Sequence, residues 1–408
     1  MQHLEAAQLF ALLAIMLGVA KVGGAAAQRL GQPAVLGELL GGVLVGQSVL
    51  RLVDPSIETI HLFSELGVFI LLLAIGLETD PRALMRVGTT SAAVAVAGVV
   101  APFTLGFLAC RLLGLGTVVA IMAGATLTAT SVGITARVLS DLGRLRDTEG
   151  QIILGAAVLD DILGLIILTV VTSMTRGQEV TVGGVLQTTG AAFGFLVVVM
   201  LAGRYLMPIV FRLTRAIDLP GTPTILALIL AFGLASLAEA SGSAMILGAF
   251  AAGLLLTSSP QFREIEHGVT ALGHFFVPLF FVTVGAAVDL RTLNPLEPDT
   301  RYALVVGLIL VAVGVVGKVV SGYAPFWFRG NRLVIGVGMI PRGEVGLIFA
   351  QMGRTAGVFN EGLFAGLTLM VMVTTFIAPP LLKTLLTVRP SRRVRVPHKG
   401  IEDLVTEA

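Results

Sequence analysis

Long apolar runs, separated by short charged loops, constrain this chain more than any other feature of its sequence. Of its 408 residues, 55% are hydrophobic and 13% are charged, whereas a soluble domain carries about 25% charged residues. Many runs reach the roughly 20 residues that cross a bilayer as a helix. Lipid offers the backbone no hydrogen-bond partner, so only helices or closed β-barrels can cross a membrane. The period-2 alternation of hydrophobicity that is typical of a membrane β-barrel is absent from this sequence. The sequence therefore predicts an all-α integral membrane protein.

Charged and turn-forming breaks divide the chain into thirteen predicted membrane-spanning segments. The second, eighth and ninth are short, and the boundary between the eighth and the ninth is the weakest. The segments lie near residues 6–27, 33–50, 60–78, 88–110, 117–139, 149–174, 183–210, 223–239, 243–258, 270–288, 302–325, 333–353 and 362–386.

Basic residues predict the orientation of these segments. Lys and Arg are more frequent in loops after odd-numbered segments, and in the stretch after the thirteenth, than in loops after even-numbered segments. The positive-inside rule then predicts a cytoplasmic C-terminus and an outside N-terminus. The stretch beyond residue 387 is too short for a domain, so we expect no soluble regulatory module. Basic residues after odd-numbered segments are Arg29, Arg82, Arg86, Arg144, Arg146, Arg212, Arg215, Arg263, Arg329 and Arg332.

The two halves of the chain match in four places, in the same order. GLETDPRAL (76–84) ends the third segment and GAAVDLRTL (285–293) ends the tenth; VLGELLGGVL in the second matches ILGAFAAGLL in the ninth. With matches between segments five and twelve and between six and thirteen, the offsets run from 209 to 213 residues. Seven segments separate each pair, so the halves must enter the membrane in opposite directions. This predicts the inverted repeat of secondary transporters, whose sites lie near the midplane at interrupted helices.

Two adjacent acids, Asp160 and Asp161, lie near the middle of the sixth segment. Each charge costs at least about 2.5–3.5 kcal/mol at the bilayer centre, and such residues are usually functional. A single neutral polar residue would join neighbouring helices at a lower cost, which argues against a purely structural role. Neighbours on a helix point about 100° apart, so one acid can hold a basic residue while the other faces an ion path. Lys318 lies too deep in the eleventh segment to reach either surface easily, and we expect it to be that basic residue.

Segments five and twelve are predicted to be interrupted at matching positions. Hydroxyl residues cluster in segment five. Segment twelve contains a proline, which removes a helical hydrogen bond. Freed carbonyls can coordinate a cation with help from hydroxyls; the alternative is hydroxyl back-bonding and a kink in continuous helices. Arg342 and Glu344 are expected to compensate each other and the half-helix ends. The predicted residues are Thr126, Thr128, Thr130, Ser131, Pro341, Arg342 and Glu344.

Glu38, Glu78 and Arg137 receive weaker predictions. The two acids lie near loops and could have a gating role, and Arg137 is expected at the cytoplasmic end of segment five. The single cysteine, Cys110, excludes an intramolecular disulfide and a thiolate metal cluster.

The motifs PAVLGELLGGVLVG, TATSVGITARVL, VLDDILGL, GKVVSG around Lys318 and MIPRGEVGLI together resemble one family. The chain is similar to bacterial monovalent cation:proton antiporters of the second cation/proton antiporter family, most closely the NapA-type sodium/proton antiporters. The resemblance implies thirteen helices, with segments five and twelve broken and crossing. It also implies Asp161 as the main cation ligand, Asp160 as the partner of Lys318, and a homodimer in the bacterial inner membrane. The implied parts are scaffold at 1–87 and 217–297, a moving core at 88–176 and 298–388, a linker at 177–216 and a basic tail at 389–408.

The predicted function is electrogenic exchange of Na⁺ or Li⁺ for protons, by alternating access with competition at the two acids. The alternatives are K⁺/H⁺ exchange, a sodium-coupled organic-anion symporter and a passive channel. Related Kef-type potassium systems often carry Gln-Asp and a nucleotide-binding domain, whereas this chain has Asp160-Asp161, which favours sodium. No nucleophile elbow, phosphate loop or metal-binding His cluster indicates an enzyme. We expect no cofactor and no nucleic-acid partner.

Overall fold

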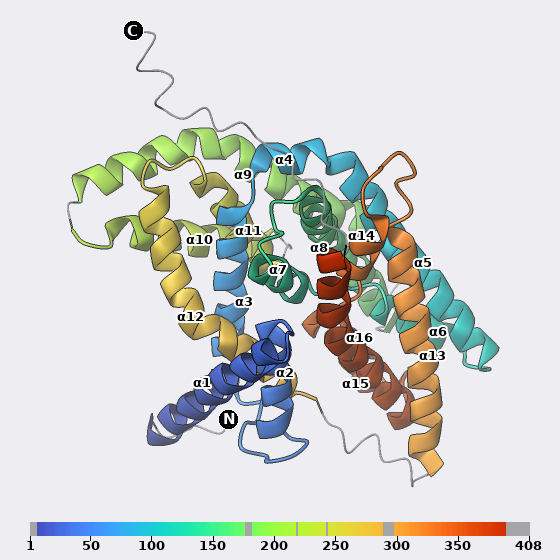
Figure 1. Ribbon diagram of the computed structural model, residues 1–408. Helices are drawn as coiled ribbons and strands as arrows, with labels where there is room; N and C mark the ends of the chain where they lie inside the picture. Colours follow the sequence, from blue (N-terminus) through green and yellow to red (C-terminus); the bar gives the residue numbers. More distant parts are fainter. Residues whose placement is uncertain (1–5, 176–181, 218, 242–243, 289–297, 389–408) are drawn as a thin grey trace.

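The computed structural model describes residues 6–175, 182–217, 219–241, 244–288 and 298–388, and all its regular structure there is helical (Figure 1). The predicted all-α membrane class is confirmed. Seven of the described helices are long and apolar enough to cross a membrane by length and composition. They are α1 (Ala6–Arg29), α3 (Glu58–Glu78), α5 (Gly88–Leu112), α10 (Thr222–Ala240), α12 (Phe262–Ala286), α13 (Pro298–Ser321) and α16 (Glu361–Val388).

Each predicted segment overlaps one helix or, for segments five and twelve, a pair of helices. Some boundaries were wrong. The second segment ends at Val45, not near 50, because Gly46 is extended and the chain folds back, so that Leu52 and Val53 donate to the Val45 carbonyl. The tenth begins at Phe262, not near 270, because its first turns are helical but polar. The other helices are α2 (Ala34–Val45), α4 (Pro81–Arg86), α6 (Thr117–Thr126), α7 (Val132–Asp141), α8 (Thr148–Thr175), α9 (Val182–Ala216), α11 (Met245–Leu256), α14 (Arg332–Gly338) and α15 (Glu344–Thr355).

The helices pack as two groups that lie on opposite sides of Figure 1. We call α1, α2, α3, α10, α11 and α12 the α3 bundle, and α5 to α8 with α13 to α16 the α13 bundle. Within each, helices from the two halves of the chain pack closely, such as α3 on α12 and α5 on α13. The bundles meet where α7 packs on α2 and α3, and where α16 packs on α2. The long helix α9 packs against α8, α10 and α11.

Glycines bring helices of the α3 bundle into backbone contact. A Cβ at Gly42 of α2 would lie 2.9 Å from the Cα of Gly285 in α12. A Cβ at Gly76 of α3 would lie 2.9 Å from the Cα of Gly253 in α11. Neither position has room for a side chain, which explains why small residues recur here, as they do between membrane helices.

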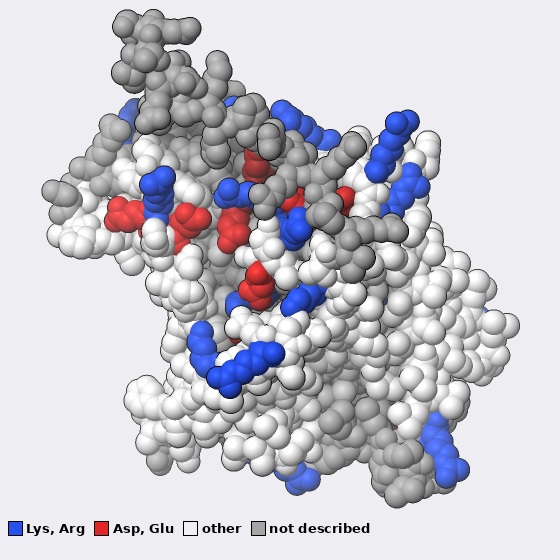
Figure 2. Space-filling view, in the orientation of Figure 1, with Lys and Arg blue, Asp and Glu red and all other residues white. Residues whose placement is uncertain are grey.

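The surface separates charge from apolar area. Figure 2 shows that Asp and Glu on this face gather toward the end where α4 and α9 lie, while most of the remaining face is uncharged. Large apolar side chains such as Val100, Leu201 and Ile229 are more than half exposed on their helices. A broad exposed apolar surface of this kind is what contact with lipid requires.

Candidate ion-binding site

Two interrupted helices form the centre of the site. Helix α6 ends at Thr126 and α7 begins at Val132, while α14 ends at Gly338 and α15 begins at Glu344. The stretches 127–131 and 339–343 between them are not helical. Pro341 cannot donate a backbone hydrogen bond and lies in the middle of the second stretch. The predicted interruptions are therefore present, and the continuous kinked helices of the alternative are not.

The two interruptions are bonded to each other. The backbone N–H of Ser131 donates to the carbonyl of Pro341 at 2.8 Å, and the Thr130 hydroxyl donates to the carbonyl of Met339 at 3.4 Å. One turn further along α7, Thr135 donates to the carbonyl of Gly338 at 2.7 Å. Backbone groups freed from one broken helix are thus partly satisfied by the other.

Thr126 and Thr128 do not reach the facing stretch. The Thr126 hydroxyl donates to the Met122 carbonyl of its own helix, α6, at 2.9 Å. The Thr128 hydroxyl, just beyond the end of α6, donates back to the Ala125 carbonyl of that helix at 2.7 Å. This is the back-bonding expected of hydroxyls inside a helix. The Ala125 carbonyl accepts from both the hydroxyl and the backbone N–H of Thr128, and these bonds support the end of α6 at the break. The hydroxyl of Thr126 bonds within a regular helical turn.

Arg342 holds the carbonyl ends of both half-helices from inside the protein. Its side chain is fully buried. One terminal nitrogen donates to Ile340 at 2.6 Å, and the other donates to Leu127 at 2.6 Å and to Gly314 of α13 at 3.4 Å. Leu127 follows the C-terminus of α6, where a helix concentrates negative partial charge, so a fixed cation is stabilising there. The side chain of Glu344 lies outside the described residues, although α15 begins with it.

Lys318 and Asp160 form a buried ion pair. The Lys318 Nζ atom lies 3.4 Å from Oδ2 and 3.5 Å from Oδ1 of Asp160, and their side chains are 0% and 1% exposed. This joins the eleventh and sixth predicted segments. The distance is longer than the roughly 2.7–2.9 Å of a tight charge-assisted bond. The pair is therefore shielded from solvent, but its charged groups lie farther apart than in a tight ion pair.

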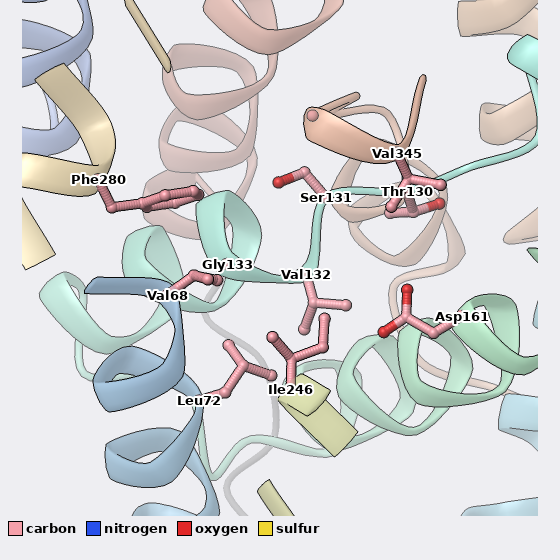
Figure 3. Close-up of a pocket in the computed structure, with 11 residues that line it drawn as sticks. Val68, Leu72, Thr130, Ser131, Val132, Gly133, Asp161, Ile246, Phe280 and Val345 are labelled. Atoms are coloured by element: carbon pink, nitrogen blue, oxygen red, sulfur yellow. The ribbon is translucent and has the colours of Figure 1, made fainter. Parts of the chain in front are cut away.

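Asp161 faces a different environment from its neighbour. It is partly exposed and projects from α8 into a pocket beside Thr130 and Ser131 (Figure 3). Apolar side chains from the α3 bundle form the other side of this pocket, so it lies between the two bundles. They are Val68, Leu72, Ile246 and Phe280. The structure thus brings one acid, two hydroxyl residues and the helix break together.

Sequence reasoning missed two parts of this region. Thr375 of α16 donates its hydroxyl to the carbonyl of Arg342 and so helps to hold the second break. Its only signal was a pair of threonines, Thr374 and Thr375, in an apolar segment. The second is an ion pair between Glu38 and Arg137, 3.8 Å apart. Each residue had been singled out, but no pattern joined positions so far apart in the chain.

Comparison with known proteins identifies the family. The model of the family described as "Sodium/hydrogen exchanger, transmembrane" matches residues 12–388. The chain belongs to this sodium/hydrogen exchanger family. It is 41% identical to the high-affinity Na⁺/H⁺ antiporter NhaS3 of Synechocystis sp., over 95% of this chain and 92% of that protein. It is 32% identical to the Na⁺/H⁺-K⁺ antiporter GerN of Bacillus cereus, over 92% and 96%.

The exchanger is also similar to a potassium-efflux protein in sequence and to a solved antiporter structure in fold. It is 29% identical to the glutathione-regulated potassium-efflux protein KefC of an Enterobacter species, of which it spans 59%. The sodium/proton antiporter MjNhaP1 of Methanocaldococcus jannaschii has a similar fold, with a TM-score of 0.71 at 18% identity over 94% of this chain and 96% of that one. The exchanger is accordingly a membrane transporter rather than an enzyme, and transport of this kind requires no cofactor.

Proposed function

We propose that the protein is an electrogenic antiporter that exchanges Na⁺ or Li⁺ for protons at Asp161. The observation that carries the proposal is the partly exposed Asp161 carboxylate, which opens on a pocket at the two helix interruptions, next to a buried Asp160-Lys318 pair. The relatives named as Na⁺/H⁺ antiporters support the choice of ions. Sodium and protons are here the transported substrates.

The cation would be held by oxygen atoms. Asp161 supplies the charge, and Thr130 and Ser131, which line the same pocket, would supply further oxygen ligands together with backbone carbonyls of the two interruptions. Broken transporter helices bind Na⁺ through such unwound carbonyls. Because a proton and the cation need the same carboxylate, only one can occupy it at a time, and the two compete.

The Asp160-Lys318 pair would supply the second of the two protons that are exchanged for each cation. When a cation binds at Asp161, Asp160 turns toward it and its bond to Lys318 weakens, so the ammonium group gives up a proton more readily. Release of the cation restores the pair. Two protons per monovalent cation move one net charge per cycle, and a membrane potential contributes about 2.3 kcal/mol per charge per 100 mV.

Alternating access would come from movement of the α13 bundle against the α3 bundle. The pairing of glycines supports an inverted repeat: Gly42 on Gly285 and Gly253 on Gly76 are the same contact, made at offsets of 211 and 209 residues. In this proposal the chain crosses the membrane thirteen times and the α3 bundle forms a homodimer. The protein lies in a bacterial inner membrane with its N-terminus outside and its C-terminus in the cytoplasm.

Proton flux in proteoliposomes tests the proposal. A gradient of Na⁺ or Li⁺ should drive proton movement in the wild type and in Glu361→Gln, which removes an acid whose side chain is 77% exposed. Asp161→Ala should abolish the flux. Flux that survives this change would show that Asp161 is not the shared ligand, and flux that never runs uphill would favour a channel.

Potassium/proton exchange is the second candidate. GerN is named for K⁺ as well as Na⁺, and KefC is a potassium-efflux protein. Titrating the same proton flux with Na⁺, Li⁺ and K⁺ separates the two. Half-maximal flux at a lower K⁺ than Na⁺ concentration would favour the second candidate.

A further inference from the structure

A second buried acid lies apart from the crossing. Glu38 in α2 is 4% exposed, and its Oε1 atom lies 3.8 Å from Arg137, beyond hydrogen-bond distance. Its Oε2 atom is buried and has no hydrogen-bond partner among the described residues. A buried carboxylate without hydrogen bonds is costly. Packing alone does not require an acid at this place. The free-energy cost of burying the carboxyl group therefore indicates that it has a function.

Arg137 is shared between two acids on different elements. Its Nε atom donates to Asp141 at 2.9 Å, one turn further along α7, while its Nη2 atom approaches Glu38. Asp141 belongs to the same helix as Arg137, but Glu38 belongs to the α3 bundle. The longer of the two contacts therefore joins the bundles, and the shorter one would keep Arg137 ordered if the longer one opened.

Two more polar contacts join the bundles at this end of the molecule. The Ser140 hydroxyl of α7 lies 3.4 Å from Glu78 at the end of α3. The Lys383 ammonium of α16 donates to the carbonyl of Gly31, which lies before α2. Together with the Glu38-Arg137 pair, these contacts make up what we call the polar seam between the bundles.

Helix α7 connects this seam to the ion site. It begins after Ser131, whose N–H is bonded to Pro341, and carries Arg137 and Asp141 in its last two turns. Ten helical residues span about 15 Å. A shift of the crossing would move Arg137 with it, because a short helix moves as one piece.

We propose that Glu38 is a second proton-binding site, and that its protonation releases a latch made with Arg137 between the two bundles. This inference rests on the alternating access of the proposed function. Ionised Glu38 attracts Arg137 and holds α7 against α2. Protonated Glu38 carries no charge, so the α13 bundle is free to move. The other charged groups around Glu38 are Lys21 of α1 and Asp141 of α7.

The direction of the pH effect follows from the charges. A fall in pH on the side where α7 ends protonates Glu38 and opens the latch, which speeds the movement. Asp141 stays bonded to Arg137 and limits how far Arg137 can turn toward other partners. Lys21 favours the ionised form of Glu38 and so opposes opening of the latch. Loss of the Glu38 charge should therefore remove one component of the pH response without removing cation binding.

Three variants in proteoliposomes test the latch: Glu38→Gln, Arg137→Gln and the double variant. Glu38→Gln mimics the protonated state, so its Na⁺-driven flux should no longer rise with protons added on the α7 side, a rise that approaches tenfold per pH unit for one proton. Arg137→Gln should do the same, and the double variant should match either single one. If the Glu38→Gln profile follows the wild type, or if the two effects multiply, Glu38 and Arg137 do not act as one latch.

Two readouts separate the latch from a structural role and from failure of the proposed function. Arg137→Lys keeps the charge and should restore the pH response, which mere loss of packing would not allow. Stabilisation against heat by added Na⁺ should persist in all three variants, because Asp161 is unchanged. If the wild type shows no exchange, the proposed function fails; if it exchanges and Glu38→Gln changes only stability, the latch fails.

Cross-linking tests whether the contact must open. With Cys110→Ala removing the one native cysteine, Glu38→Cys and Arg137→Cys can be joined by a cleavable bifunctional thiol reagent. Flux should stop and return on reduction. A control pair, Ser48→Cys with Val288→Cys, lies just after α2 and α12, two helices of the same bundle, and should tolerate the link. Full flux with residues 38 and 137 linked would overturn the proposal.

Discussion

The Nζ atom of Lys318 lies 3.4 Å from the Oδ2 atom of Asp160, and neither side chain is more than 1% exposed. Removing one partner of such a pair leaves a buried charge without compensation, which costs more than the pair itself contributes. This asymmetry makes the pair testable by changing one residue or both.

Lys318→Gln is expected to destabilise the protein by about 3–5 kcal/mol, because Asp160 is left as an unpaired buried charge. Adding Asp160→Asn should recover much of the loss, since two neutral amides can bond to each other. Heat denaturation in detergent measures both. Losses that simply add would mean that the residues do not interact. The double variant should also alter the charge moved per cycle, measured as current across a supported membrane.

Thr130→Val is expected to weaken cation binding more than Thr126→Val. The Thr130 hydroxyl donates from one helix interruption to Met339 in the other and lines the Asp161 pocket, whereas the Thr126 hydroxyl bonds to Met122 in its own helix. A hydrogen bond worth about 0.5–1.5 kcal/mol predicts a two- to twelvefold rise in the Na⁺ concentration for half-maximal flux. Equal effects of the two variants would assign Thr130 to the fold rather than to the ion site.

Protons and sodium should compete at one site. Raising the proton concentration on the side that binds Na⁺ is expected to increase the Na⁺ concentration for half-maximal flux, by up to about tenfold per pH unit. The maximal flux at saturating Na⁺ should stay constant, because enough cation displaces every proton from Asp161. This requires flux measured over a matrix of Na⁺ concentrations and pH values. A falling maximal flux with constant Na⁺ affinity would exclude a shared carboxylate.

Gly42→Ala is expected to destabilise the protein by about 1–3 kcal/mol, the range for inserting an extra carbon into a packed contact. The added Cβ would meet the backbone of α12 at Gly285. Gly18→Ala in α1 is the matched control, since nothing lies within 4 Å of its Cβ position, and there alanine should be neutral or favourable in a helix. Heat denaturation of both in one detergent decides whether this backbone contact matters.

Much of the fold followed from the sequence because lipid limits the choice of structure. Apolar runs of sufficient length must become helices, and their positions agree with the described helices to within a few residues at most ends. The wrong helix boundaries lie where the length and hydrophobicity of a segment do not determine where its helix begins or ends. The stretch 262–269 is polar enough to resemble a loop, but it is helical and packs against α10, where Thr224 donates to the carbonyl of Glu264 and lies against Gly268.

The sequence also marked the residues of the candidate site but not their partners. Asp160, Asp161 and Lys318 were conspicuous because charge is expensive in an apolar segment. Which acid pairs with Lys318 depends on the rotation of α8 and its distance from α13, and the resemblance alone had assigned Asp160. Thr126 and Thr130 looked alike in the sequence, and only the backbone around them separates a back-bonded hydroxyl from one that reaches Met339.

By itself the sequence determined the membrane class, the approximate helices, the places where two of them break and the acids worth testing. These properties depend on local composition and on the uniform demand of lipid for satisfied backbone groups. The tertiary structure alone decided that Arg342 binds the carbonyl of Leu127, that Asp161 opens on a pocket between bundles, and that Glu38 faces Arg137. Such contacts join residues far apart in the chain, and their geometry is set by how whole helices pack.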